Sequence, residues 1–305
     1  MRIHNNKKLF SFQDLKDFTE CKFAVDLDLC NLTEPINKAK KSEWSQILFK
    51  KGNKFEKDYL ESLVASRSPG IQITNIQESP SLEERVNLTH DAMRTGSDLI
   101  YQAALHLNDF HGIADLLRKI EGKSTFGDYS YEVIDIKSRT EPAPEHLLQV
   151  SLFTFLLGEI QEFTPERMYI VTGDLNEHAF KYSNFSNYFQ AILREFKTYV
   201  STAQPNKYRV PIPCSFCVFC KWRDHCNSLW DDTDHVSKIG GVTRRQVIAL
   251  ENSGIKTISK LTALGKKNTV RGIGKTMVSN IQTNATLLLR KRKTGQPLFQ
   301  FKELE

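Results

Sequence analysis

The spacing of apolar residues predicts a succession of helices and strands over the first two hundred residues. Apolar positions recur every three or four residues in four segments that predict helices, at 11–21, 42–66, 81–96 and 141–158. β-Branched and aromatic residues cluster in shorter runs that predict strands, at 98–107, 110–120, 131–137, 167–174 and 178–183. A helix from about Tyr188 to Thr202 closes the series. This order is typical of an α/β fold with a mixed sheet flanked by helices.

Particular residues predict where these elements begin and end. Ser81 and Glu84 form a capping box at the start of one helix. Asn108–Asp109 predicts a tight turn between two strands. Pro144 and Gly158 are expected to begin and end the helix that follows the strand at 131–137.

The pattern and the charge both change after residue 235. Residues 236–305 show helical spacing alone and hold 14 Lys and Arg against 3 Asp and Glu, a net charge of +11. Of the chain's 42 basic and 36 acidic residues, 28 and 33 therefore remain in residues 1–235. We predict an α/β domain over 1–232 and a small all-α domain over 236–305. A basic domain beside an acidic body indicates a polyanionic partner, with nucleic acid first.

The strand at 131–137, "YEVIDIK", places charge among apolar residues. Asp135 and Lys137 share a strand face with Val133, whereas Ile134 and Ile136 point to the other face. Apolar residues on both faces predict a strand that is covered on both sides. A carboxylate and an ammonium are costly to bury there unless they are paired or bind an ion.

Two other carboxylates accompany the pair. Asp115 shares a predicted strand face with Ile113 and Leu117, and Glu56 lies beside the apolar stripe of the helix at 42–66. If these carboxylates converge with Asp135, their oxygens favour Mg²⁺ or Mn²⁺. Such a metal activates water and polarises a phosphodiester, while a neighbouring lysine stabilises developing charge.

Three other polar residues near these motifs are interpreted as structural. Glu132 lies on the opposite strand face from Asp135 and is predicted to be an ion-pair partner. His111 and His146 are predicted to be surface or hydrogen-bonding residues.

The chain has six cysteines, and four of them lie within thirteen residues in the pattern C-x2-C-x2-C-x5-C. They are Cys214, Cys217, Cys220 and Cys226; the others are Cys21 and Cys30. In a reducing compartment such spacing indicates Zn²⁺ or an iron–sulfur cluster and not disulfides. The spacing alone permits a local four-cysteine site.

The segment "VRGIGKTMVSNIQ" has the Gly-x-Gly of a helix-hairpin-helix module. Gly272 and Gly274 permit a tight turn that exposes backbone N–H groups to a phosphate, and Arg271 and Lys275 flank it. We expect this module to hold DNA through its phosphates. The alternative is a small helical domain with an ordinary glycine turn.

The segments "GIADLL", "YEVIDIKS" and "QVSLF" together resemble the motifs of RecB-like PD-(D/E)XK nucleases, and the likeness extends over nearly the whole chain. It implies a restriction-endonuclease-like core in which Asp115 and Asp135 bind metal, with the Ile136 carbonyl as a further ligand. Lys137 would then be catalytic, and Gln149 would orient Lys137 or the DNA. The family's Gln-x-x-x-Tyr motif departs here, because position 153 is Phe. Glu56 matches an upstream family ligand.

The same resemblance implies that one N-terminal cysteine joins three C-terminal ones. On that basis a [4Fe–4S] cluster would be bound by Cys21, Cys217, Cys220 and Cys226, with Zn²⁺ on a set that includes Cys214 as the alternative. Larger members of the group continue into an RNase H-like domain, so a helicase or an RNase H-like protein is an expected partner.

These observations predict a metal-dependent DNA nuclease, an exonuclease acting on single strands or ends, in repair, recombination or defence. One alternative is a catalytically weak DNA-binding subunit of a larger complex, for which Phe153 is one sign; another is an RNA-directed nuclease. The chain has no apolar run that would cross a bilayer, and its N-terminus lacks the apolar stretch of a secretion signal, so we expect a cytoplasmic protein without a membrane partner.

Overall fold

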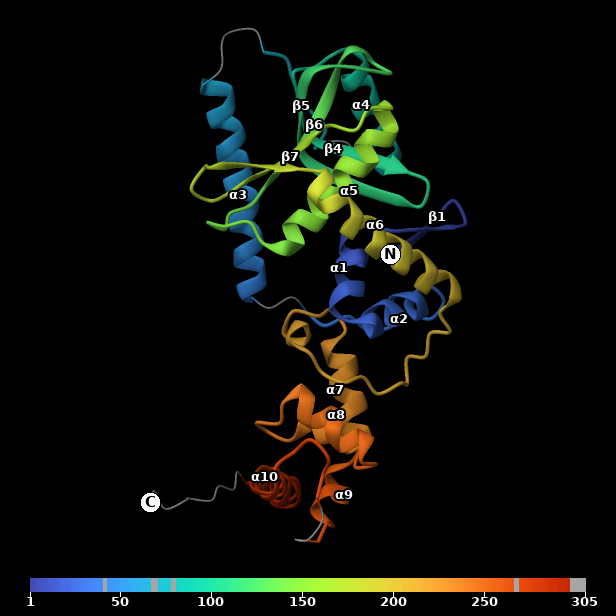
Figure 1. Ribbon diagram of the computed structural model, residues 1–305, viewed down its shortest axis with the longest axis vertical. Helices are drawn as coiled ribbons and strands as arrows, with labels where there is room; N and C mark the ends of the chain where they lie inside the picture. Colours follow the sequence, from blue (N-terminus) through green and yellow to red (C-terminus); the bar gives the residue numbers. More distant parts are fainter. Residues whose placement is uncertain (41–42, 67–70, 78–80, 266–268, 297–305) are drawn as a thin grey trace. The chain divides into compact units, whose positions relative to one another are not determined.

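The computed structural model describes residues 1–305 except 41–42, 67–70, 78–80, 266–268 and 297–305 (Figure 1). Two compact units are distinguished: Met1–Leu32 with Lys41–Gln204, and Thr33–Lys40 with Pro205–Glu305. We call them the sheet unit and the helical unit. No helix in the described part of the chain is long and apolar enough to cross a membrane.

The sheet unit is built on a six-stranded mixed sheet in the order β3-β4-β5-β6-β7-β8. Pairing is parallel between β3 and β4 and between β6 and β7, and antiparallel elsewhere. A separate hairpin pairs β1 (Arg2–His4) with β2 (Lys7–Leu9). The six strands are β3 (Ile73–Asn75), β4 (Leu99–Leu107), β5 (Phe110–Ser124), β6 (Gly127–Ile136), β7 (Arg167–Val171) and β8 (Glu177–Lys181).

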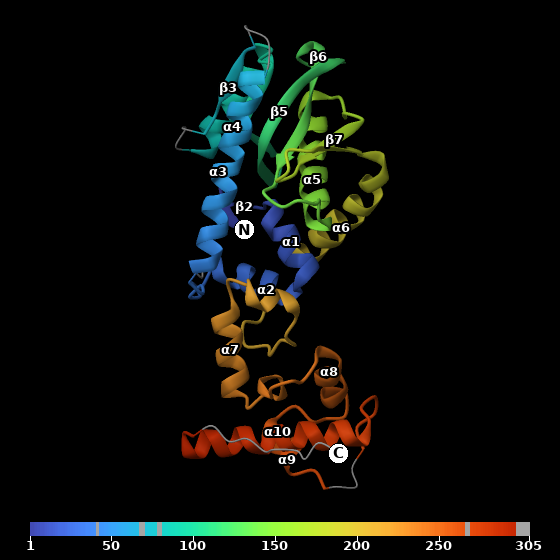
Figure 2. The same cartoon turned by 90° about the vertical axis from the view of Figure 1, so that its left-hand side faces the viewer.

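Helices cover both faces of the sheet (Figures 1 and 2). On one face α1, α4, α5 and α6 enclose the larger core, which includes Val133 and Leu117. On the other face α3 packs through Tyr59 against a smaller cluster that includes Leu116 and Ile134. The helices of the unit are α1 (Phe12–Glu20), α2 (Lys22–Asn31), α3 (Glu43–Ser66), α4 (Leu82–Arg94), α5 (Pro144–Gln161) and α6 (Ser183–Thr202). The predicted mixed sheet with flanking helices is confirmed.

Local predictions hold with a few corrections. Ser81 caps α4 by accepting the Glu84 N–H, and Asn108 takes φ +54° in the predicted turn. Gly158 does not end α5, which continues to Gln161. A Cβ at Gly158 would lie 2.8 Å from Thr164 Oγ1, so this glycine serves close packing instead. The helix predicted from Tyr188 begins at Ser183, and α2 and the two short strands β1 and β2 were not predicted.

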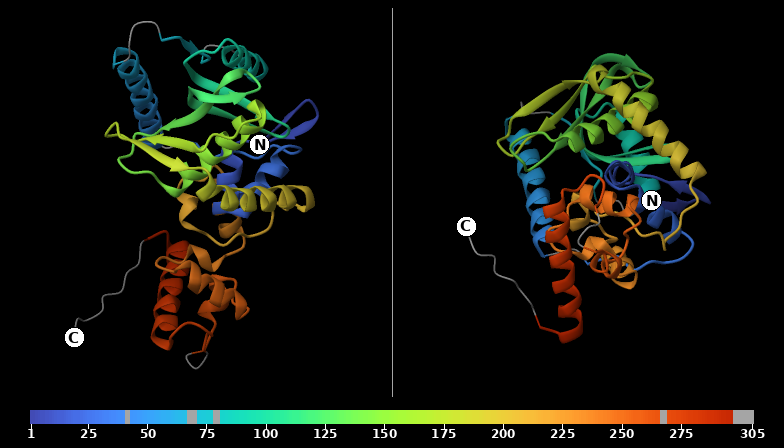
Figure 3. Two further views of the ribbon diagram at one scale, coloured as in Figure 1. Left: turned by 45° about the horizontal axis from the view of Figure 1, so that its top comes forward. Right: turned by 60° about the horizontal axis from the view of Figure 1, so that its bottom comes forward.

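The helical unit contains α7 (Arg223–Asp232), α8 (Arg244–Asn252), α9 (Ile258–Thr262) and α10 (Lys275–Thr294), with short 3-10 turns at Ser215–Val218 and Val236–Lys238 (Figure 3). Its core includes Val247, Leu250 and Ile281, and Ile212 packs against it. The Arg244 guanidinium also donates to the Ile212 carbonyl. The cysteine segment therefore belongs to this unit, which starts upstream of the boundary predicted at 232–236. The predicted helical C-terminal region is confirmed.

Candidate functional site

The site lies where β4 and β5 both interrupt the regular alternation of their side chains between the two faces of the sheet. On β4, Ile100 and Ala103 belong to the larger core, although strict alternation would place them on opposite faces. On β5, Ala114 and Leu117 do the same. Gln102 has φ +56°, a left-handed conformation that costs a non-glycine residue about 1–2 kcal/mol.

Gln102 and Asp115 both lie between the paired positions Tyr101↔Leu116 and Ala103↔Ala114. The alternation of side chains between the two sheet faces is therefore interrupted at the same place on both strands. The prediction that Asp115 shares a regular strand face with Leu117 is wrong, because the alternation is interrupted at Asp115 itself. Backbone strain of this kind is concentrated at functional sites in proteins.

Asp115, Asp135 and Lys137 come together at the end of β6. Lys137 Nζ lies 2.7 Å from Asp135 Oδ2 and 3.8 Å from Asp115 Oδ2. The Asp115 side chain is held from the other side, where its Oδ2 accepts the Ile136 N–H at 2.7 Å. The backbone N–H of Lys137 donates to the Val171 carbonyl at 2.8 Å, which fixes the end of the strand. The predicted convergence of the two aspartates with the lysine is confirmed.

Glu56 of α3 approaches the same group from the second face of the sheet. Its carboxylate accepts hydrogen bonds from the Gln102 amide and from Tyr101. The pKa of Glu56 is raised to about 7. Burial is the largest cause, the negative charge of Asp115 adds to it, and Tyr101, Gln102 and Lys137 oppose it. Glu56 thus joins the site, as predicted.

Charges are crowded in this site. Asp135 is completely buried, and this burial raises its pKa to about 7 despite the neighbouring Lys137 ammonium, with Asp115 adding to the increase. Burial by itself would lower the pKa of Lys137, but Asp135 and Asp115 reverse the direction and raise it. Lys137 is therefore a cation at neutral pH, and the three carboxylates compete for its single positive charge.

The donor set of the site is one that a hard cation prefers. Asp135 Oδ2 is buried and has no hydrogen bond of good geometry in the described structure, although Lys137 Nζ is close to it. Carboxylate oxygens of this kind are ligands for Mg²⁺ or Mn²⁺. Across the described ranges, no group of three or more His, Cys, Asp or Glu side chains has the arrangement of a complete metal site. The aspartates instead share the Lys137 ammonium.

Tyr101 and Gln102 were missed from the sequence. Both lie in a segment whose apolar character predicted an ordinary strand, and Gln102 was the single strongly polar side chain in "LIYQAAL". That isolated amide was the available signal, because an amide in a covered strand needs a hydrogen-bond partner.

The other polar residues that the sequence placed near the motifs differ in outcome. Gln149 is half-buried on α5, and none of the described groups bonds its side chain, so its orienting role stays a prediction. His146 is buried and its Nδ1 accepts the Ala143 N–H, which confirms a hydrogen-bonding role and excludes a surface one. His111 is half-buried, and its Nδ1 has no hydrogen-bond partner within the described ranges, so its interpretation as a surface or hydrogen-bonding residue stays a prediction. The predicted ion pair of Glu132 is confirmed, with Arg118.

Phe153, which occupies the Tyr position of the motif to which the sequence was likened, belongs to the larger core. It is buried there, and a Cβ on Gly112 would lie 2.2 Å from its ring. Phe153 and Gly112 therefore form a close contact between α5 and β5. The interpretation of Phe153 as a sign of weak catalysis stays a prediction.

The four clustered cysteines all lie in the helical unit. Backbone N–H groups point to two of the sulfurs: the Cys214 N–H to Cys217 Sγ and the Trp222 N–H to Cys220 Sγ, each at 3.4 Å. Such donors stabilise thiolates, the form that binds metals. Cys21 lies in the sheet unit, between α1 and α2. A ligand set that combines Cys21 with Cys217, Cys220 and Cys226 stays a prediction.

The predicted glycine hairpin is present at the start of α10. Gly272 has φ +86°, and Gly274 is the N-cap of the helix. Arg271 and Lys275 are exposed on either side of it. Val278 and Ile281 are buried in the core of the unit, as expected for the second helix of such a hairpin.

Comparisons with known proteins add little to this geometry. No protein-family model and no curated protein matches the chain. Among solved structures, the crystal structure of SSO0001 is similar over 58% of this chain and 95% of its own, with 13% sequence identity and a TM-score of 0.23.

Proposed function

We propose that the protein is a metal-dependent nuclease with a PD-(D/E)XK core of the RecB-like type. The observation that supports this most is the convergence of Asp115 and Asp135 on Lys137, from two strands, at the point where the sheet is irregular. The raised pKa values of Asp135 and Glu56 indicate a site with excess negative charge, which a divalent cation would relieve.

Asp115 and Asp135 would hold Mg²⁺ or Mn²⁺, with the Ile136 carbonyl and Glu56 as further ligands. The chemistry supplied by a cation in this position is polarisation of a phosphodiester and acidification of water. The protein's own contribution follows from the contacts. The Ile136 N–H fixes the Asp115 carboxylate, and Tyr101 and Gln102 hold Glu56.

Lys137 would act as a cation and not as a base. Since its pKa is raised, its Nζ carries three protons at neutral pH. It would release part of its interaction with Asp135 when the metal binds and donate to a phosphoryl oxygen or to the attacking water. This stabilises the negative charge that develops in the transition state.

We further propose DNA as the substrate, held in part by the hairpin at Arg271, Gly272, Gly274 and Lys275. The exposed basic residues beside Gly272 support phosphate contact without base recognition.

The N–H donors at Cys217 and Cys220 support thiolate ligands for a [4Fe–4S] cluster, with Zn²⁺ as the alternative.

Cleavage of end-labelled single- and double-stranded DNA by anaerobically purified protein tests the proposal. With Mg²⁺ or Mn²⁺, wild type should cut and Lys137→Ala should be slower by about a hundredfold or more. Lys119→Ala, which removes a lysine paired with Asp98, is the matched control and should retain activity. Equal rates for the wild type and Lys137→Ala would contradict the proposal. DNA binding without cleavage would favour the binding-subunit alternative.

A further inference from the structure

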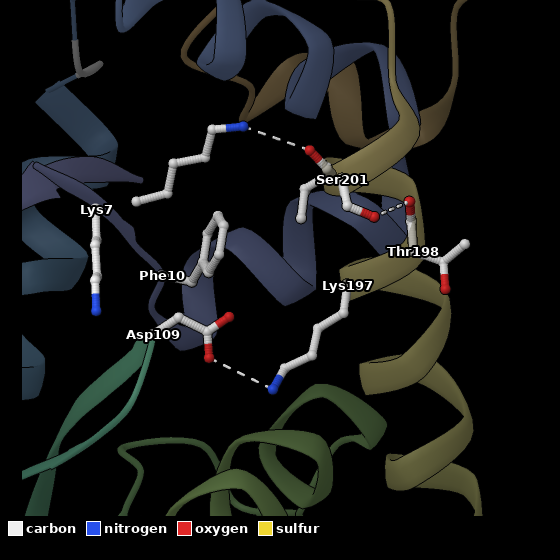
Figure 4. Close-up of a pocket in the computed structure, with 8 residues that line it drawn as sticks. Lys7, Phe10, Asp109, Lys197, Thr198 and Ser201 are labelled. Carbon is white, nitrogen blue, oxygen red and sulfur yellow. Dashed lines mark hydrogen bonds and ion pairs between the residues drawn. The ribbon is translucent and has the colours of Figure 1, made fainter.

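A groove outside the carboxylate site collects lysines from distant parts of the sheet unit (Figure 4). It has a volume of about 610 Å³ and is lined by Lys7 and Lys8 of β2 and by Lys197 of α6, with Phe10 and Asp109 between them. Figure 4 shows Lys7 and Lys197 on either side of the Phe10 ring.

A second groove, of about 420 Å³, lies beside the first on α6. Thr198 lines both grooves, and Lys22 and Arg194 add positive charge to the second. Together five cations face two carboxylates, Asp109 and Glu195. This concentration is notable because residues 1–235 as a whole carry more acidic than basic side chains.

The cations of the two grooves are largely unneutralised. Lys197 pairs with Asp109, at 3.4 Å between exposed groups, a geometry worth little in water. Lys7 and Arg194 have no ion pair with any described residue. Lys22 lies over the Phe18 ring at 4.9 Å, which holds its ammonium at the surface without cancelling its charge. Elsewhere in this unit Arg118 contacts two carboxylates, Glu132 and Glu177.

The arrangement suits a chain of phosphates better than a single anion. Arg194 and Lys197 are three residues apart on one helix, so their side chains are neighbours, about 5–6 Å apart at Cβ. The row continues across Thr198 to Lys7 and Lys8. The aromatic rings Phe10 and Phe18 are buried beneath it and are not free to stack on bases. Contact would therefore be made with the backbone, independently of sequence.

We propose that these two grooves form a track for the phosphodiester backbone of a nucleic acid. Asp109 lies in the turn just before β5, six residues before Asp115, so the track begins about 20 Å from the carboxylate site along the direction of the strand. That the bound chain is the substrate of this site rests on the proposed function. The track itself rests on charge and shape alone.

The test is a binding measurement with the full chain, carried out in EDTA so that cleavage is absent. The triple variant Lys7→Gln/Lys8→Gln/Lys197→Gln is compared with Lys123→Gln/Arg167→Gln/Lys181→Gln, which removes equal charge from exposed positions outside both grooves. Single-stranded poly(dT) is titrated at several salt concentrations, and the thermal midpoint of each variant confirms folding.

We expect the track variant to bind more weakly and its slope of log K against log salt to be smaller by about two, at about 0.7 for each lost phosphate contact. The control variant should keep the wild-type slope. Equal slopes in the two variants would overturn the proposal, as would competition by polyglutamate as effective as that by poly(dT). If the track variant loses binding and the wild type does not cleave DNA with Mg²⁺ or Mn²⁺, the track is supported and the proposed nuclease activity is rejected. If the wild type cleaves DNA and the track variant binds poly(dT) as the wild type does, the nuclease activity is supported and the track is rejected.

Discussion

The Asp115 side chain accepts a 2.7 Å hydrogen bond from the backbone N–H of Ile136, the residue between Asp135 and Lys137. This bond joins β5 to β6 by a side chain at the point where their backbone pairing, last seen at Leu116↔Ile134, has ended. It orients this carboxylate oxygen toward Lys137, whose Nζ lies 3.8 Å away.

Asp115→Asn tests the charge of this residue separately from its hydrogen bond. The amide oxygen can still accept the Ile136 N–H, so we expect the free energy of unfolding to change by less than about 1 kcal/mol. Metal-dependent cleavage should fall by about a hundredfold or more, because a carboxylate ligand is lost. Urea unfolding and initial cleavage rates measure the two effects. Asp115→Ala is the comparison and should lose both stability and activity.

Stability without metal should depend on pH through Glu56. Its pKa is about 7 in the folded protein and about 4.5 in the unfolded chain, so the folded state binds more protons between these values. Stability therefore decreases as the pH rises through this window. The difference in thermal midpoint between Glu56→Gln and wild type, measured in EDTA, should become more favourable to the variant from pH 5 to pH 8. Added Mn²⁺ should reduce that difference at pH 8. A pH-independent difference would contradict the burial of Glu56.

Substitutions at Gln102 separate backbone strain from its hydrogen bond. Both Gln102→Gly and Gln102→Ala remove the amide bonded to Glu56, but only glycine relieves the φ of +56°. We expect the glycine variant to be more stable than the alanine variant by about 1 kcal/mol, measured by urea unfolding. The reverse order would show that the strand is regular at this position.

Gly112→Ala should destabilise the sheet unit by about 1–3 kcal/mol, because the new Cβ would lie 2.2 Å from the Phe153 ring. Gly112→Ala/Phe153→Leu should recover part of the loss. The matched control is Gly240→Ala, whose Cβ has no atom within 4 Å, and its effect should stay within about 0.5 kcal/mol. Thermal and urea unfolding give the values.

The ligand set of the cysteine cluster can be decided by single substitutions. Anaerobically purified wild type should show the visible absorbance of a [4Fe–4S] cluster, and Cys217→Ser should lose it. Cys21→Ser should also lose it, whereas Cys214→Ser should retain it. Retention in Cys21→Ser with loss in Cys214→Ser would assign the local four-cysteine set, and bound zinc in place of iron would assign Zn²⁺.

Much of this protein follows from local sequence pattern. Helix and strand positions, the Asn108 turn and the Ser81 cap depend on periodicity and on residues close together in the chain. The pairing of Asp135 with Lys137 was also predictable. Two opposite charges two residues apart in a covered strand are costly to bury unless they pair with each other or bind an ion. The helical and basic character of the C-terminal region is likewise a property of composition.

Other features of the protein depend on contacts between segments that are distant in the sequence, and only the tertiary structure shows them. The interruption of side-chain alternation at Gln102 and Asp115 occurs at the same place on two paired strands, and the sequence of one strand alone does not reveal it. The end of α5 was misplaced because Gly158 is required by Thr164, a contact beyond the helix. The lysine track combines β2 with α6, nearly two hundred residues apart. Local sequence determines which elements form and which residues carry charge. Contacts between distant segments determine which charges meet, because burial and proximity exist only after folding.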